Sequence, residues 1–242
     1  MTLARCFLVI CLSVFIVGQA WAEPMPDELR AVLKSFRAEG SKGWAFTQTT
    51  RGDGKSQTER FDPRAHEYKR WTLLEKDGHP PTPEEAKRYN ELQTRRSTGE
   101  SAPNVKDQLD ESSGERVSDD GVRAVWRFKL QAKEKDDTSA AHMHATFTLH
   151  RPSATIERVE LASFEPFRPV LGISITEAKT VMDYSLPENG RPTLLKSVTM
   201  KVRGRAWWLR SMDQDLEISY SDYVPLRPSP APAPAPAKET SR

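Results

Sequence analysis

The chain is poor in cysteine and lacks the motifs that mark common catalytic and nucleotide-binding sites. Among its 242 residues the only cysteines are Cys6 and Cys11, so residues 23–242 have no thiol for a disulfide, a cysteine-ligated metal or a cysteine nucleophile. No G-x-S-x-G, P-loop, dinucleotide fingerprint or H-E-x-x-H occurs. These absences predict that the protein is not an enzyme and has no catalytic residue, no cofactor and no metal.

An excess of charge of one sign is also missing. The net charge is only +2, although 29% of the residues are charged. Proteins that bind nucleic acid gather Lys and Arg on one face, so we expect no nucleic-acid partner. His142, His144 and His150 share one face of a predicted strand and have a spacing that can ligate a metal. No further ligand is evident and threonines share the face, so a solvated outer face is the preferred interpretation.

Residues 1–22 have the order of a secretory signal peptide. Arg5 is their only charged residue, an apolar run follows over 6–17, and Ala20-Trp21-Ala22 gives the small-x-small end. The run is too short for a membrane span, which needs about 20 residues. We expect cleavage before Glu23, a periplasmic product and no stable transmembrane anchor after cleavage. Residues 23–224 are predicted to form one domain, and residues 225–242, rich in Pro and Ala, a disordered tail.

Alternation of apolar and polar residues predicts many β-strands. It is clearest over 122–130 and 142–150 and rougher over 156–161. Asp-Gly and Asn-Gly pairs, which tolerate the positive φ of tight turns, occur at 53–54, 77–78, 120–121 and 189–190. Together these features favour an antiparallel meander. Further strands are predicted at 44–50, 55–61, 68–74, 171–175, 180–186, 193–202, 206–212 and 215–223.

Two stretches have helical signals. Residues 27–38 form an amphipathic pattern, with Asp27 as its expected cap. Residues 82–96 begin with Thr82, Pro83 and Glu85, the arrangement of a capping box. One further turn of helix is expected at 105–109. The predicted fold is therefore mainly β: a strongly curved antiparallel sheet, or incomplete β-barrel, covered by two or three short helices.

Large apolar side chains come from many of the predicted strands. If they face one way they line the inside of a curved sheet, where Met and aromatic groups suit an adaptable cavity wall. The alternative is an ordinary filled core. The candidate ligand-binding residues are Trp44, Phe46, Trp71, Leu73, Trp126, Phe128, Met143, Phe147, Leu149, Ile173, Ile175, Met182 and Trp207.

The order of elements resembles a known family. The segments that carry the likeness are Arg60-Phe61-Asp62-Pro63, Trp71-x-Leu73-Leu74, Met182-x-Tyr184 and Ser221-Asp222-Tyr223. Over residues 27–224 the chain resembles the LolA-like outer-membrane lipoprotein-sorting proteins. The resemblance implies a half-barrel (LolA/LolB-like) with helices over a hydrophobic cavity, which in the carrier holds lipoprotein acyl chains. The Pro-Ala tail and the charged loops depart from that carrier.

These features together predict a periplasmic binding or carrier protein for a lipid or acyl-chain ligand, held in the hydrophobic cavity of the half-barrel. The ligand could be the acyl chain of a lipoprotein. The alternative is a non-enzymatic interaction module of the cell envelope. Such a module would bind a protein partner through its sheet face or its Pro-rich tail.

Overall fold

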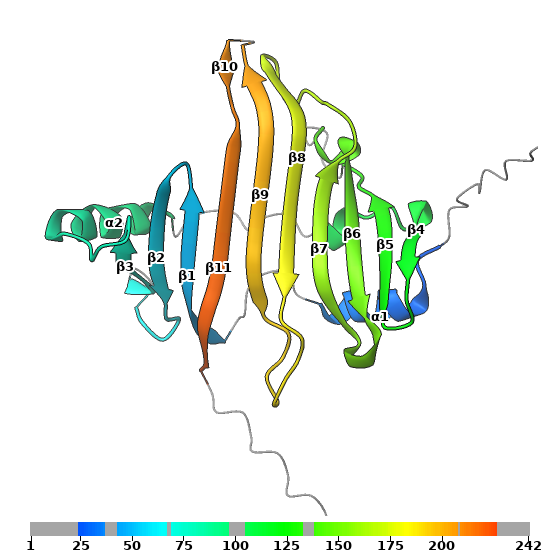
Figure 1. Cartoon of the computed structure of the whole chain (residues 1–242), viewed down its shortest axis with the longest axis horizontal. Helices are drawn as coiled ribbons and strands as arrows, with labels where there is room; N and C mark the ends of the chain where they lie inside the picture. Colours follow the sequence, from blue (N-terminus) through cyan, green and yellow to red (C-terminus); the bar gives the residue numbers. More distant parts are fainter. Residues whose placement is uncertain are drawn as a thin grey trace, which may run out of the picture.

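The computed structural model describes residues 24–36, 43–66, 69–96, 105–132, 138–207 and 209–226. The predicted signal peptide and residues 227–242 of the predicted tail lie outside the described residues. Eleven strands form one antiparallel sheet (Figure 1). They are β1 (Trp44–Gly52), β2 (Lys55–Phe61), β3 (Trp71–Lys76), β4 (Glu115–Asp119), β5 (Arg123–Lys129), β6 (Met143–His150), β7 (Thr155–Ser163), β8 (Ile173–Tyr184), β9 (Leu195–Ala206), β10 (Arg210–Ser211) and β11 (Gln214–Pro225).

The sheet is curved and does not close into a barrel, which confirms the predicted fold class. Its strand order is β3-β2-β1-β11-β9-β8-β7-β6-β5-β4, with β10 paired to β9. Strands β3 and β4 are therefore the two edges. The last strand, β11, lies between β1 and β9, so it joins the N-terminal strands to the rest of the sheet.

Three of the four predicted Asp-Gly and Asn-Gly turns have positive φ at both residues, whereas at 120–121 only Gly121 does. Asp53 and Gly54 have φ of 52° and 71°, and Asn189 and Gly190 have φ of 52° and 76°. Positive φ at both central residues matches the twist of the flanking strands. The β1–β2 hairpin follows from this, with Gly52 opposite Lys55.

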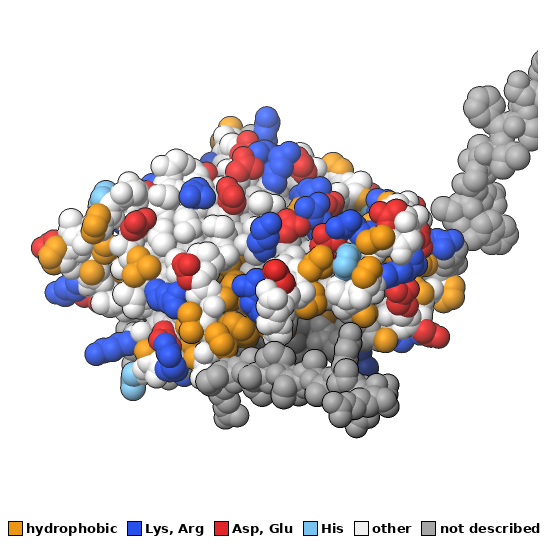
Figure 2. Space-filling model, turned by 60° about the horizontal axis from the view of Figure 1, so that its bottom comes forward, with side chains coloured by type: hydrophobic (Ala, Val, Ile, Leu, Met, Phe, Trp, Pro, Cys, Tyr) orange, Lys and Arg blue, Asp and Glu red, His pale blue; other side chains and the backbone are white. Residues whose placement is uncertain are grey.

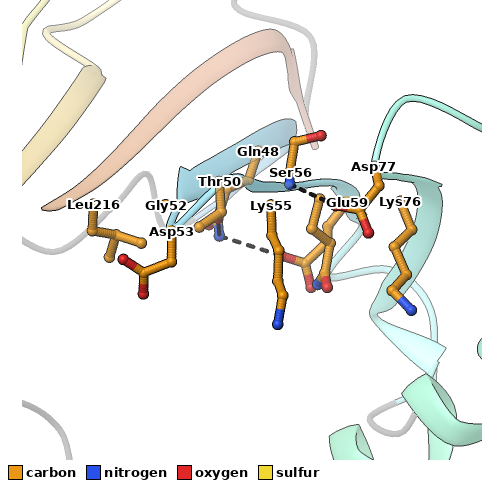
Figure 3. Close-up of a pocket in the computed structure, with 11 residues that line it drawn as sticks. Gln48, Thr50, Gly52, Asp53, Lys55, Ser56, Glu59, Lys76, Asp77 and Leu216 are labelled. Carbon is orange, nitrogen blue, oxygen red and sulfur yellow. Dashed lines mark hydrogen bonds between the residues drawn. The ribbon is translucent and has the colours of Figure 1, made fainter. Parts of the chain in front are cut away.

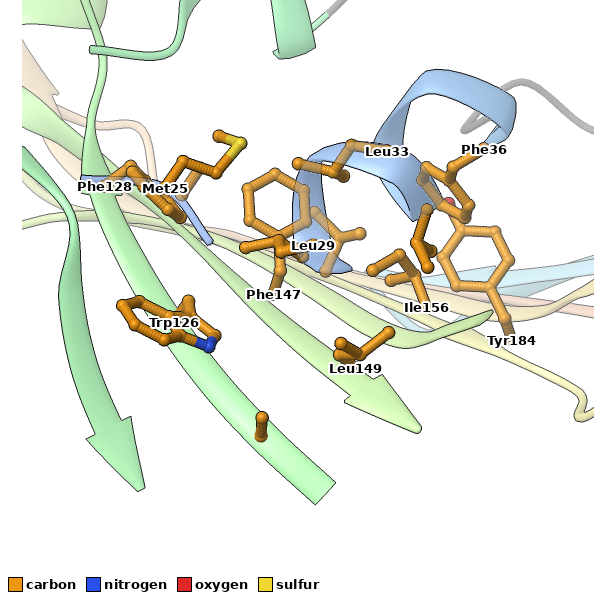
Figure 4. Packing of buried hydrophobic residues seen from close by; sticks show 14 of the residues in the cluster. Met25, Leu29, Leu33, Phe36, Trp126, Phe128, Phe147, Leu149, Ile156 and Tyr184 are labelled. Atoms are coloured by element: carbon orange, nitrogen blue, oxygen red, sulfur yellow. The ribbon is translucent and has the colours of Figure 1, made fainter. Parts of the chain in front are cut away.

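Helix α1 (Asp27–Ser35) packs on the half of the sheet formed by β5 to β8 (Figure 4). Its buried residues Leu29 and Leu33 meet Phe128 and Phe147 in one apolar cluster. Phe36, just past the helix, stacks edge-on against Tyr184 with ring centroids 5.0 Å apart. The cluster removes most of its side chains from water, and it holds the helix to the sheet through the hydrophobic effect.

Helix α2 (Pro83–Arg96) lies at the other edge of the sheet, beside β3 (Figure 1). Its capping box is present as predicted, because Thr82 N donates to Glu85 Oε2 at 3.0 Å and Glu85 N donates to Thr82 Oγ1 at 3.3 Å. Its Tyr89 is buried and reaches Glu59 on β2. Within the described residues, no helix is long and apolar enough to cross a bilayer.

Some boundaries differ from the prediction. The two strands predicted at 171–175 and 180–186 are the single strand β8, which continues through residues 176–180 with a bulge between Ile175 and Glu177 opposite β9. Of the strand predicted at 206–212, Ala206 ends β9 and Arg210–Ser211 form β10, whereas Trp207 and Leu209 lie in a turn between them. Asp27 is the first residue of α1 and not its cap, because Pro26 occupies the N-cap position.

The face of the sheet opposite the helices carries ion pairs between neighbouring strands. Arg158 on β7 contacts Asp183 on β8 at 2.6 Å, and Arg203 on β9 contacts Asp215 on β11 at 2.7 Å. On the surface shown in Figure 2, basic and acidic side chains are interspersed. These pairs place charged side chains on the outer face, as expected for a face in contact with water.

Candidate functional site on the inner face of the sheet

Strand register aligns apolar side chains in rows across the inner face. One row begins under α1 with Trp126, which is paired to Phe147 and through it to Val159. The same row continues across β8, β9 and β11 through Met182, Val198 and Ile218. Because paired residues in neighbouring strands point to the same face, these side chains form one continuous apolar surface.

Burial changes along this surface. Trp126, Phe147 and Val159 are buried under α1, at 5%, 1% and 1% exposure. The residues of β8, β9 and β11 that follow are only half-buried, although they belong to the same rows. We call this part of the inner face the central apolar strip; its members are Met182, Val198, Met200, Leu216 and Ile218.

An aromatic cluster borders the strip where β1 begins. Phe46 lies at its centre, with its ring centroid 5.1 Å from Phe61, 5.8 Å from Trp71 and 5.6 Å from Tyr220. Such separations and tilted rings are typical of favourable aromatic packing. The cluster therefore gives the β1–β3 side of the inner face an aromatic wall, which meets the core under α1 through Tyr220.

An open pocket of about 340 Å³ lies at the other end of β1 and β2 (Figure 3). It is continuous with the strip, because Leu216 belongs to both. Its other lining residues are mostly polar: Gln48, Thr50, Gly52, Asp53, Lys55, Ser56, Gln57, Glu59, Lys76 and Asp77. Thr50 is paired with Ile218 across β1 and β11, so the row of apolar residues ends in this polar pocket.

Glu59 is the only charged residue that is buried in the described part of the chain, with 5% exposure. Its Oε1 accepts a hydrogen bond of 2.6 Å from the Tyr89 hydroxyl, and its Oε2 accepts one of 3.4 Å from Gln48 Nε2. A buried carboxyl group is costly unless it is hydrogen-bonded. Burial, and then the nearby Glu59 charge, raise the pKa of Tyr220 above its ordinary value.

The two lysines of the pocket differ in their partners. Lys76 Nζ lies 2.6 Å from Glu85 Oε1, and this bond is the main cause that lowers the pKa of Glu85 to about 2. Lys55 makes no ion pair with any described residue. Figure 3 shows Lys55 beside Glu59 in the pocket. Lys55 is thus a cationic group that no described residue pairs, and it shares the pocket with the carboxylates Asp53, Glu59 and Asp77.

The structure divides the predicted ligand-binding residues among several places. Trp126, Phe128, Phe147 and Leu149 are buried in the core under α1, and Met143 packs against that core. Phe46 and Trp71 lie in the aromatic cluster, where Trp44 joins through Tyr223 at 6.3 Å. Leu73 is buried opposite Glu59. Met182 alone of the predicted set belongs to the central apolar strip.

The remaining three predicted residues lie towards the far end of β8 and β9. Ile175 is buried where β8 pairs with Gly204, and Ile173 is half-buried at the start of β8. Trp207 was expected on the inner wall but follows β9 in a turn and is 63% exposed. This is a correction: its φ of 49° breaks the strand, so the alternation that predicted its direction no longer applies.

The three histidines have separate partners. His142 Nδ1 lies 2.8 Å from Glu165 Oε1, and His150 Nδ1 lies 2.6 Å from Ser153 Oγ. The His144 ring stacks on Phe164 at 4.6 Å, and burial followed by the Arg127 charge lowers its pKa. No group of three metal-ligating side chains converges within the described residues.

Sequence reasoning missed the polar pocket and most of the strip. A signal for the pocket is present, because Phe46, Gln48 and Thr50 alternate on one face of β1, so polar groups interrupt an apolar face. A signal for the strip is present too. Val198 and Met200, and likewise Leu216 and Ile218, fall two residues apart in strands that the pattern predicted.

Comparisons with known proteins assign no family. No protein-family model matches the chain, and no curated protein matches it. Among solved structures, an isomerase-inactive variant of GphF DH1 is 10% identical and aligns over 83% of this chain and 80% of that one, with a TM-score of 0.18. So low a TM-score carries no argument about fold or function.

Proposed function

We propose that the protein binds a lipid or another molecule with an acyl chain on the inner face of its sheet. The observation that carries the proposal is the change in burial along one row. The row is closed under α1 but remains half-buried across β8, β9 and β11. An acyl chain lying on the central apolar strip would remove these side chains from water.

The polar pocket supports an amphiphile over a plain hydrocarbon. It adjoins the strip at Leu216 and offers hydrogen-bonding groups from Gln48 and Thr50. The pocket sets Asp53, Glu59 and Asp77 against Lys55 and Lys76, so its charge suits a zwitterionic head group whose phosphate meets Lys55. The resemblance to LolA-like proteins and the signal-like residues 1–22 agree with a carrier or binding protein of the periplasm, and we propose that location too.

Chain length gives the first test. Each methylene moved from water onto an apolar surface contributes about 0.8 kcal/mol, or roughly a fourfold change in Kd. Displacement of a fluorescent fatty-acid probe by saturated fatty acids of increasing length should approach this dependence. Native mass spectrometry of the purified protein should show the same ligands bound. Absence of both bound lipid and probe displacement would refute the proposal.

A double substitution tests whether the ligand binds on the central apolar strip. Val198→Thr with Ile218→Thr adds two hydroxyl groups and shortens only the second side chain, and each hydroxyl costs about 1–3 kcal/mol when covered by an acyl chain. Fatty-acid affinity should therefore fall at least tenfold. The matched control is Thr199→Val, on the outer face of the same strand. Equal affinity in all three proteins would exclude the strip as the binding surface.

A further inference from the structure

The most exposed apolar side chains of the described structure gather at one end of the sheet. Leu171 precedes β8 and is 92% exposed, Leu209 and Trp207 follow β9 and are 88% and 63% exposed, and Val170 is 57% exposed. Every other exposed large apolar side chain in the described residues falls between 37% and 47%. We call Val170, Leu171, Trp207 and Leu209 the apolar tip.

The tip projects from the molecule. Strands β8, β9 and β10 extend beyond the rest of the sheet at one end, and the tip residues belong to the turns there (Figure 1). Ala206, the last residue of β9, pairs with Ile173, the first of β8. The two apolar turns therefore lie side by side. A flat surface that approached this end of the sheet would meet these turns before the other strands.

Backbone contacts hold the two turns together. Trp207 N donates to Gly172 O at 2.6 Å, and Ile173 N donates to Val170 O at 3.2 Å. The indole of Trp207 packs so closely on Gly172 that a Cβ there would lie 2.9 Å from its ring. Trp207 itself has a φ of 49°, an unfavourable value for a bulky residue. Strained backbone that is held by surrounding contacts is common at functional sites.

Basic side chains surround the tip. Arg168, Arg205 and Arg210 are exposed, and none of them makes an ion pair with a described residue. Further down the strands the basic residues are paired, as in Lys201 with Glu177 at 2.9 Å. Two acidic groups lie near the tip: Asp213, which accepts from Gly204 N, and Glu165, which contacts His142. The three arginines outnumber them. The end of the sheet thus combines apolar projections with unpaired positive charge.

We propose that the apolar tip docks the protein on an anionic lipid bilayer. Tryptophan and leucine side chains enter the interfacial layer, and Arg168, Arg205 and Arg210 lie at the level of the lipid phosphates. A protein partner fits the geometry less well, since a standard interface buries about 800 Å² on each side and two narrow turns offer no such flat or concave area. The proposal does not depend on the ligand of the central apolar strip.

Vesicle flotation tests the docking. The purified protein should float with vesicles of mixed phosphatidylcholine and phosphatidylglycerol, and less with phosphatidylcholine alone. Leu171→Asp with Leu209→Asp should weaken binding at least tenfold. The control, Leu74→Asp with Val122→Asp, replaces two apolar side chains that are 42% and 44% exposed away from the tip, and it should leave binding unchanged. Replacing each arginine of the set by Gln should weaken binding by about fivefold and reduce its salt dependence.

Fluorescence locates the contact. Tryptophan emission should shift to shorter wavelength when vesicles are added, and Trp207→Phe with Trp208→Phe should remove most of that shift. Thermal unfolding of each variant establishes that it is folded, which the high exposure of the replaced side chains favours. The proposal is overturned by absence of vesicle binding. It is also overturned if both double variants bind equally, or if tip substitutions dissolve a dimer of the chain and leave vesicle binding unchanged.

Discussion

Removing the Tyr89 hydroxyl tests how the second helix is held on the sheet. The hydroxyl donates 2.6 Å to Glu59 Oε1, and Glu59 is only 5% exposed. In Tyr89→Phe the carboxyl group keeps its buried position and loses its shorter hydrogen bond, so that only the 3.4 Å contact with Gln48 remains. A hydrogen bond to a charged group contributes about 1.5–3 kcal/mol. The free energy of unfolding should fall by about that amount.

Urea unfolding followed by circular dichroism measures this loss, and the melting temperature should fall by roughly 3–12 °C for a chain of this size. Tyr223→Phe is the matched control, because its hydroxyl donates 2.5 Å to a neutral acceptor, the carbonyl of Leu195. That bond should contribute about 0.5–1.5 kcal/mol. The double variant Glu59→Gln with Tyr89→Phe should show strong coupling. If Tyr89→Phe costs no more than Tyr223→Phe, the reasoning about the buried carboxyl group is wrong.

Two further predictions concern the helices. Leu29→Ala should lower the free energy of unfolding by about 2–5 kcal/mol, because Leu29 has 0% exposure in the core under α1. The control is Leu92→Ala, since Leu92 is 47% exposed on α2. In the same urea titration it should change the free energy of unfolding by less than about 0.5 kcal/mol. The pKa of Glu85 is lowered from 4.5 to about 2, so the stability it contributes is present above pH 4.5 and is lost as the pH falls through 2. The difference in unfolding free energy between the wild type and Glu85→Gln should therefore shrink over that interval; a difference that grows with acidification would contradict the assignment.

Patterns among neighbouring residues predicted the strands and helices that depend on residues close together in the sequence. Alternation identified β5 and β6, whose buried residues Trp126, Phe128 and Phe147 all lie under α1 as one face. The capping box of Thr82 and Glu85 identified the start of α2. These signals involve residues a few positions apart, so they do not need the rest of the fold.

Features that depend on partners distant in sequence could not be predicted. The strands predicted at 171–175 and 180–186 form one strand because β8 stays paired with β9 on both sides of its bulge. The burial of Glu59 depends on Tyr89, 30 positions away in a different element. The pocket needs β1, β2 and β11 together. Alternation shows that Gln48 and Thr50 interrupt an apolar face, but only pairing with Tyr220 and Ile218 shows which surface they border.

The two unpaired edges of the open sheet have a consequence for self-association. Free strand edges are templates on which identical chains can add and grow into aggregates. Edge strand β4 is short, exposed and charged at Glu115 and Asp119, and a bulge between Arg116 and Ser118 breaks its regular hydrogen-bonding pattern. At the opposite edge, α2 lies beside β3. These features of both edges disfavour the addition of further chains to the open sheet.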